Sequence, residues 1–205
     1  MSRWADLPGA ARGQRYAARF DELAASGVDV HGEARFCAAL LPEGGRVLDA
    51  GCGTGRVAIW LAGQGYDCVG VDVDEEMLAE AERAAPGIPW VRADLATIDL
   101  AAHGHDEPFD LVVAAGNVIP LLAQGTERIA VHRLSELLRP GGLLVAGFGL
   151  DAVHLPLPEA TVSLSDYDTW CAEVGLRLRE RYATWDGDPY EDGGYAVSVH
   201  QAEGA

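Results

Sequence analysis

The sequence predicts a doubly wound α/β fold, in which a mostly parallel sheet carries helices on both faces. From about Arg46 onward, short apolar runs alternate with helical patterns, which is typical of successive strand–helix–strand units. The composition agrees with a globular core, because 49% of the residues are hydrophobic and 23% are charged. The inner strands are predicted at Arg46–Ala50, Asp67–Asp72, Trp90–Asp94, Phe109–Ala115 and Gly142–Phe148.

Apolar residues at helical spacing predict the helices that connect these strands. They are expected at Arg56–Gln64, Glu75–Ala85 and Thr126–Leu138. Ser165 and Asp168 have the spacing of a capping box, which predicts the start of a further helix that ends near Gly175. The last two apolar runs, Leu176–Tyr182 and Tyr195–Gln201, are predicted strands that could close the sheet with an antiparallel edge.

The length of 205 residues predicts a single globular domain, because domains typically hold roughly 150 residues. Residues 1–41 precede the first strand, and Tyr16 and Phe20 lie at helical spacing, so one or two helices are expected there. This segment is a candidate lid, and Trp4 lies on the part best able to fold over a pocket. Residues 42–205 are expected to form the ligand-binding domain.

Charge and cysteine spacing argue against several partners. The formal net charge of −17 would repel a phosphate backbone or an anionic membrane, so neither nucleic acid nor membrane is expected. No apolar run of about 18 residues is present, and residues 1–6 lack the apolar run of a secretory signal. The four cysteines include no Cys-x-x-Cys pair, which predicts a reduced, cytoplasmic protein without a metal site.

Composition also excludes enzymes that depend on lysine. All 15 basic residues are arginine. The chain therefore cannot form a Schiff base through its own side chain, a P-loop or a pyridoxal-phosphate site.

The central motif is a strand that ends in an acid, followed by a loop with alternate glycines and then a helix. It runs from Val47 to Val57, and its glycines are Gly51, Gly53 and Gly55. Glycine allows a sharp turn and a close approach of the backbone to a ligand, and the first N–H groups of a helix offer donors to it. We expect a flat, polar ligand here, although a tight strand-to-helix connection could alone require such glycines.

Two later acids narrow the ligand class. Asp72 ends the second strand about twenty residues past the glycine loop, where a carboxylate can accept both hydroxyls of a ribose. Asp94 ends the third strand, within reach of an adenine amino group. Either acid alone could be a helix cap, but acids at successive strand ends together predict an adenosine site.

A nicotinamide or flavin site would use similar chemistry, and the motif argues against it. The dinucleotide pattern is G-x-G-x-x-G, whereas the glycines here follow Gly51-x-Gly53-x-Gly55 with Asp49 two residues ahead. The charge of Asp49 is unfavourable near a diphosphate and favourable near the amine and sulfonium of S-adenosylmethionine.

On these motifs the chain resembles the class I S-adenosylmethionine-dependent methyltransferases, as a small single-domain member of bacterial type, from Arg46 to Gln201. The segments similar to the family's motifs are Val47–Gly55, Val69–Leu78, Trp90–Leu95 and Leu138–Leu144. The resemblance implies a Rossmann-like sheet of seven strands with an antiparallel last strand. It also implies that Val73 and Leu95 bracket the adenine, and that Asp49 orients the glycine loop beside the methionine part.

The resemblance thus predicts S-adenosyl-L-methionine as cofactor and S-adenosyl-L-homocysteine as product. The predicted cofactor-binding residues are Asp49, Gly51, Cys52, Gly53, Thr54, Gly55, Asp72, Val73, Met77, Asp94, Leu95 and Ala115.

The acceptor is expected beyond the carboxyl ends of the strands, beside two loops. Asn117 follows the fourth strand and could orient the acceptor or hold its own loop. His154 lies in the loop Gly149–Pro158 and is the candidate base by position, because histidine titrates near neutral pH. The alternative for His154 is an exposed loop side chain.

We expect direct in-line methyl transfer to a small-molecule acceptor, aided mainly by positioning. An oxygen, nitrogen, carbon or sulfur acceptor fits equally. One alternative is a catalytically silent domain that binds the same cofactor and serves a partner; the other is a nicotinamide-dependent oxidoreductase.

Overall fold

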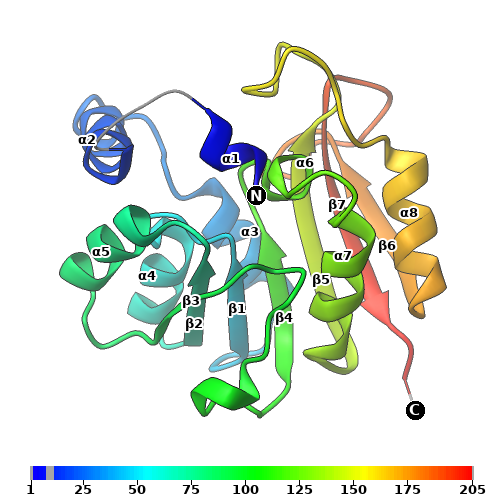
Figure 1. Cartoon of the computed structure of the whole chain (residues 1–205), viewed down its shortest axis with the longest axis horizontal. Coiled ribbons are helices and arrows are strands. Elements are labelled where there is room, and N and C mark those ends of the chain that lie inside the picture. The colour runs from blue at the N-terminus through cyan, green and yellow to red at the C-terminus, as the bar shows by residue number, and fades with distance from the viewer. Residues whose placement is uncertain (1, 8–11, 205) are drawn as a thin grey trace.

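The structure is a computed structural model that describes residues 2–7 and 12–204. Its sheet has seven strands in the order β3-β2-β1-β4-β5-β7-β6 (Figure 1). The strands are β1 (Arg46–Ala50), β2 (Asp67–Asp72), β3 (Trp90–Arg92), β4 (Phe109–Ala114), β5 (Leu138–Gly149), β6 (Leu176–Tyr182) and β7 (Tyr195–Ala202). The first five are parallel, and β7 pairs antiparallel with both β5 and β6. The predicted α/β fold with an antiparallel last strand is confirmed.

The strand order reverses beside β1, which lies between β2 and β4. Connections that leave neighbouring strands toward opposite faces open a crevice at the carboxyl ends of those strands. The glycine loop after β1 and the loop after β4 therefore meet at one edge of the sheet.

The helices within the described residues are α1 (Arg3–Asp6), α2 (Arg12–Ala25), α3 (Gly32–Leu40), α4 (Arg56–Gly63), α5 (Glu75–Ala84), α6 (Val118–Leu121), α7 (Glu127–Glu136) and α8 (Leu164–Glu173), with a short 3-10 helix, η1 (Ala101–His103). None of them is long and apolar enough to cross a membrane. Side chains along β1 alternate between the two faces of the sheet. Leu48 therefore lies in the core that includes α7 and α8, and Val47 lies in the core that includes α3 and α4.

The segment before β1 differs from the prediction of one or two helices, because the described part holds three. The third, α3, belongs to the core: Ala34 and Cys37 are fully buried in the cluster that contains α4. α3 is therefore part of the core, and only α1 and α2 remain candidates for the predicted lid.

Two other details correct the sequence expectations. The cap of α8 is Ser163, whose hydroxyl accepts from the backbone N–H of Asp166 at 3.1 Å, so the prediction of Ser165 was wrong. Both serines have an aspartate three residues later, but Asp168 instead pairs with Arg181. The strand β5 begins four residues before the predicted start, because Leu138 already pairs with Phe109 ahead of a register shift.

Candidate active site

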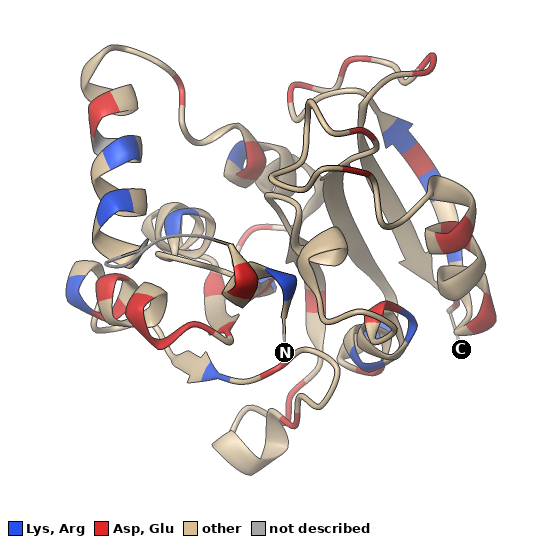
Figure 2. Ribbon diagram, turned by 45° about the horizontal axis from the view of Figure 1, so that its top comes forward, with Lys and Arg blue, Asp and Glu red and all other residues tan. Residues whose placement is uncertain are grey.

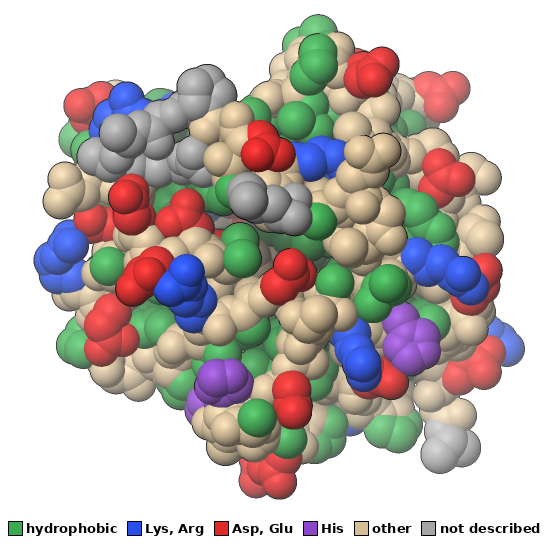
Figure 3. All heavy atoms as spheres, in the orientation of Figure 1, with side chains coloured by type: hydrophobic (Ala, Val, Ile, Leu, Met, Phe, Trp, Pro, Cys, Tyr) green, Lys and Arg blue, Asp and Glu red, His purple; other side chains and the backbone are tan. Residues whose placement is uncertain are grey.

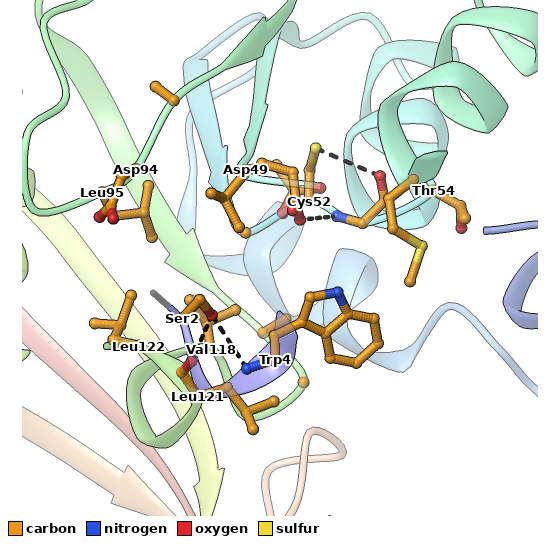
Figure 4. A pocket seen from close by; sticks show the side chains of 18 of the residues that line it. Ser2, Trp4, Asp49, Cys52, Thr54, Asp94, Leu95, Val118, Leu121 and Leu122 are labelled. Atoms are coloured by element: carbon orange, nitrogen blue, oxygen red, sulfur yellow. Dashed lines mark hydrogen bonds between the residues drawn. The ribbon is translucent and has the colours of Figure 1, made fainter. Parts of the chain in front are cut away.

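A cleft opens at the carboxyl ends of β1, β2 and β4. The space free of protein atoms in and in front of it, open solvent included, is about 960 Å³. Figure 4 shows its two walls. Asp49, Cys52, Thr54, Asp94 and Leu95 lie on one wall. The facing wall comes from α1 and α6, with the side chains Ser2, Trp4, Val118, Leu121 and Leu122.

The glycine loop has positive φ at Gly51, Gly53 and Gly55, which are 76°, 55° and 80°. A Cβ atom at Gly51 would lie 2.6 Å from Val118, and one at Gly55 would lie 2.4 Å from Trp90. At Gly53, which lines the cleft, an added Cβ would meet no atom within 4 Å. Packing therefore explains the outer glycines, whereas the central one presents bare backbone to the cleft.

Asp72 ties the glycine loop to the end of β2. Its two carboxylate oxygens accept from the backbone N–H groups of Gly53 and Asp74, each at 2.8 Å. Burial raises the pKa of Asp72, and these two N–H groups counter part of that rise. Each oxygen retains a second lone pair, so the carboxylate can still accept from a ligand in the cleft.

Asp49 is the most buried acid of the cleft, with 2% of its surface exposed. It accepts from the backbone N–H of Ala58 at 3.1 Å, so it anchors the first turn of α4 that follows the glycine loop. Burial raises its pKa to about 7. A cation placed beside Asp49 would favour the ionised carboxylate and would itself be stabilised.

The third acid, Asp94, turns the chain after β3. It accepts from the backbone N–H of Ala96 at 2.9 Å. On the same wall, Val73 keeps 39% of its surface exposed, unlike the valines of the core. An open apolar face beside carboxylates suits a nucleoside, because the base needs an apolar contact and its polar atoms need acceptors.

The residues that line the cleft include eleven of the twelve predicted cofactor residues. The exception is Gly55, whose backbone packs against Trp90 instead. The lining also includes eleven residues outside that prediction: Ser2, Trp4, Tyr16, Arg56, Val57, Ala93, Gly116, Val118, Leu121, Leu122 and Ala123. Arg56 follows the glycine loop directly and could have been found from that position. Trp4, Tyr16, Val118 and Leu121 come from helices whose packing the sequence pattern does not reveal.

The helix α1, which is part of the facing wall, also contacts the side of the cleft formed by β2 and α5. The indole Nε1 of Trp4 donates to Asp74 at 2.8 Å, at the start of α5. Arg3 Nη1 donates to Glu127 at 2.7 Å and to the backbone oxygens of Pro120 and Leu122 at 3.0 Å. Because Glu127 is buried, this ion pair is more than a surface contact.

The predicted catalytic residues lie outside the cleft lining. Asn117 donates to the backbone oxygen of His154 at 3.0 Å and accepts from the N–H of Gly149 at 2.7 Å. His154 Nδ1 lies 2.8 Å from Asp151, and this histidine is exposed. In this arrangement the contacts of both residues hold the loop after β5. Their catalytic roles stay predictions.

Comparisons with known proteins agree with this geometry. A family model described as a methyltransferase domain matches residues 47–142. The putative methyltransferase YqeM of Bacillus subtilis is 28% identical, over 87% of this chain and 75% of that protein. A demethylmenaquinone methyltransferase of Beutenbergia cavernae is 32% identical, over 78% of this chain and 73% of that protein.

Among solved structures, a TehB-like S-adenosylmethionine-dependent methyltransferase from Corynebacterium glutamicum is 34% identical, with a TM-score of 0.83 over 94% of this chain and 99% of that one. The nicotinamide alternative is therefore excluded. The glycine loop, the fold and these relatives together show that the chain belongs to the S-adenosylmethionine-dependent methyltransferases, with S-adenosylmethionine as its cofactor.

Proposed function

We propose that this methyltransferase acts on a small-molecule acceptor, by direct in-line transfer that depends mainly on positioning. The observation that carries the proposal is the shape of the cleft. The cofactor wall and an apolar wall face one another, and α1 crosses between them. A site closed by its own chain suits a small acceptor better than an extended polymer. The net charge of −17 further opposes nucleic acid.

The chain's residues fit the cofactor part by part. Asp72 would accept from the ribose hydroxyls and Asp94 from the adenine amino group, while Val73 and Leu95 would contact the adenine faces. Gly51, Cys52, Gly53 and Thr54 would approach the methionine part closely through backbone, and Met77 and Ala115 would complete the wall.

Asp49 would supply negative charge near the methionine part of the cofactor. The bound cofactor supplies a methyl group already activated on a sulfonium. The protein therefore needs to orient the acceptor and exclude water, and such positioning can lower a barrier by roughly 7 to 11 kcal/mol. A base is needed only for an acceptor that must lose a proton before or during attack.

We also propose that α1 and α2 form the lid. Trp4 packs edge-to-face against Tyr16 of α2 with ring centroids 6.3 Å apart, and both line the cleft. At the other side of the cleft, Arg3 contacts Glu127 and Ser2 donates to the backbone oxygen of Leu121, so both residues hold α1 in place. Opening these contacts would expose the cofactor wall for exchange.

The test of the function combines binding with transfer. Calorimetry should detect S-adenosylhomocysteine binding to the wild type, and Asp72→Asn should weaken it by about tenfold or more, because a bond to a charged group contributes roughly 1.5 to 3 kcal/mol. Incubation with methyl-labelled S-adenosylmethionine and a protein-free metabolite extract should then give a labelled small product. Binding without any labelled product from the extract would contradict the proposed acceptor class.

A further inference from the structure

The walls of the cleft differ in chemistry, and the difference bears on the acceptor. The wall opposite the cofactor residues is apolar and aromatic. Its side chains include Trp4, Val118, Leu121 and Leu122 (Figure 4). Tyr16, which also lines the cleft, packs against Trp4. Such a wall binds the apolar body of a ligand and provides few polar groups that could recognise a charged one.

The charges around the cleft are acidic. Asp49, Asp72 and Asp94 line it, and among the side chains that the structure describes Arg56 is the single basic group in the lining. Arg15 and Arg19 lie exposed on α2, where Figure 2 shows basic positions along the helix, and neither lines the cleft. Acidic side chains also spread widely over the face in Figure 3.

Arg56 is already neutralised by a partner. Its two terminal nitrogens donate to the two carboxylate oxygens of Glu33 at 2.8 and 2.7 Å, and it also donates to the backbone oxygen of Val30. The guanidinium stacks over Phe20 at 4.6 Å. The side chains of Arg56 and Glu33 are only 17% and 19% exposed, so this bidentate pair is largely desolvated. An incoming carboxylate or phosphate would have to displace Glu33 from it.

We propose that the acceptor is a non-anionic small molecule with an apolar body, attacked at an uncharged atom that carries a lone pair, such as an amine nitrogen. This inference rests on the proposed function. The lone pair of the acceptor forms the bond to the methyl carbon, the carbon–sulfur bond breaks with its electron pair left on sulfur, and the positive charge passes to the acceptor atom. An acceptor atom that carries hydrogen then loses a proton to water.

The acids of the cleft favour this charge pattern. A neutral nucleophile keeps the total positive charge in the cleft constant during transfer. An anionic nucleophile would enter against the carboxylates that line the cleft, and its methylation would then remove the sulfonium charge that helps to compensate them.

The test separates acceptors by charge. A protein-free metabolite extract is divided on a strong anion exchanger into an anionic fraction and a flow-through of neutral and cationic compounds. Each fraction is incubated with enzyme and labelled S-adenosylmethionine. Each is also dialysed to equilibrium against the enzyme loaded with S-adenosylhomocysteine, and mass spectrometry identifies the retained compounds.

We expect the flow-through to support at least tenfold more transfer than the anionic fraction, and the retained compounds to come from it. Glu33→Gln should raise retention of anions, because it keeps the shape of the pair and leaves the charge of Arg56 uncompensated. Glu107→Gln, which removes the same charge from the pair with Arg46 far from the cleft, is the matched control and should change nothing.

Transfer or retention confined to the anionic fraction would overturn the inference while leaving the proposed function intact. Equal retention of anions by wild type and Glu33→Gln would also overturn it. Absence of transfer from both fractions would instead contradict the proposed function.

Discussion

Gly53 offers a sharp test of the cleft, because an alanine there should separate binding from folding. Its φ of 55° is left-handed, and an alanine in that region costs about 1 to 2 kcal/mol. No atom lies within 4 Å of the added Cβ, so no clash adds to that cost. For a chain of this size, such a loss lowers Tm by about 2 to 8 °C. Gly53→Ala should therefore remain folded.

Binding should suffer more, because the methyl group projects from a residue that lines the cleft. Forcing one extra carbon into a well-packed contact typically costs about 1 to 3 kcal/mol, which weakens binding by about 10- to 100-fold. The assay is calorimetric titration with S-adenosylhomocysteine, alongside thermal unfolding without ligand.

Gly44→Ala is the matched control. Gly44 also has a left-handed φ, 72°, and an added Cβ there meets nothing within 4 Å, but it lies exposed in the turn before β1. Both variants should lose similar stability, and only Gly53→Ala should lose affinity. Equal affinities of the two variants would refute the assignment of Gly53 to the cofactor wall.

Other changes test the same site. Gly55→Ala should lower Tm more than either variant above, because its Cβ would lie 2.4 Å from Trp90; an equal loss would contradict the packing argument. Burial raises the pKa of Asp49 from 3.8 to about 7. Between these two pH values the folded chain keeps a proton on Asp49 that the unfolded chain releases, so the contribution of Asp49 to the free energy of unfolding falls as the pH rises from 3.8 to about 7. The Tm of Asp49→Asn minus the Tm of the wild type should therefore be more positive at pH 8 than at pH 5. A difference in Tm that does not change with pH would argue against a protonated Asp49. Arg3→Ala should speed S-adenosylhomocysteine release in stopped-flow measurements by about tenfold, which corresponds to a loss of roughly 1.4 kcal/mol in lid closure. Arg128→Ala, which removes an exposed ion pair of α7, is the control and should leave the release rate unchanged. Equal release rates of the two variants would contradict the lid.

Local patterns predicted half of the residues that line the cleft. The bounds of β1, β2 and β6 agree with those expected, and the residues after β1, β2 and β3 gather around one cleft as the strand order requires. The reason is physical: alternation of apolar residues sets a strand, positive φ demands glycine, and parallel strands bring their carboxyl ends to one edge.

The opposite wall was beyond such patterns. Trp4 reaches Asp74, and Arg3 reaches Glu127, across 70 and 124 positions of the chain. The short helix α6, which supplies the apolar side chains, has no helical period long enough to recognise. The predicted roles of Asn117 and His154 came from loop position alone and stay predictions. Asn117 bonds to Gly149, 32 positions away, whereas His154 contacts Asp151 within its own loop.

The order of residues along the chain was thus enough to predict the α/β fold, the methyl donor and most of the wall that would hold it, because those features depend on near neighbours and on strand order. The partnering of Arg56 with Glu33, the bridge formed by α1 and the apolar wall facing the cofactor residues emerged from three-dimensional packing. Each of these features depends on contacts between side chains that are distant in sequence, and the local periodicity of apolar residues carries no information about such contacts.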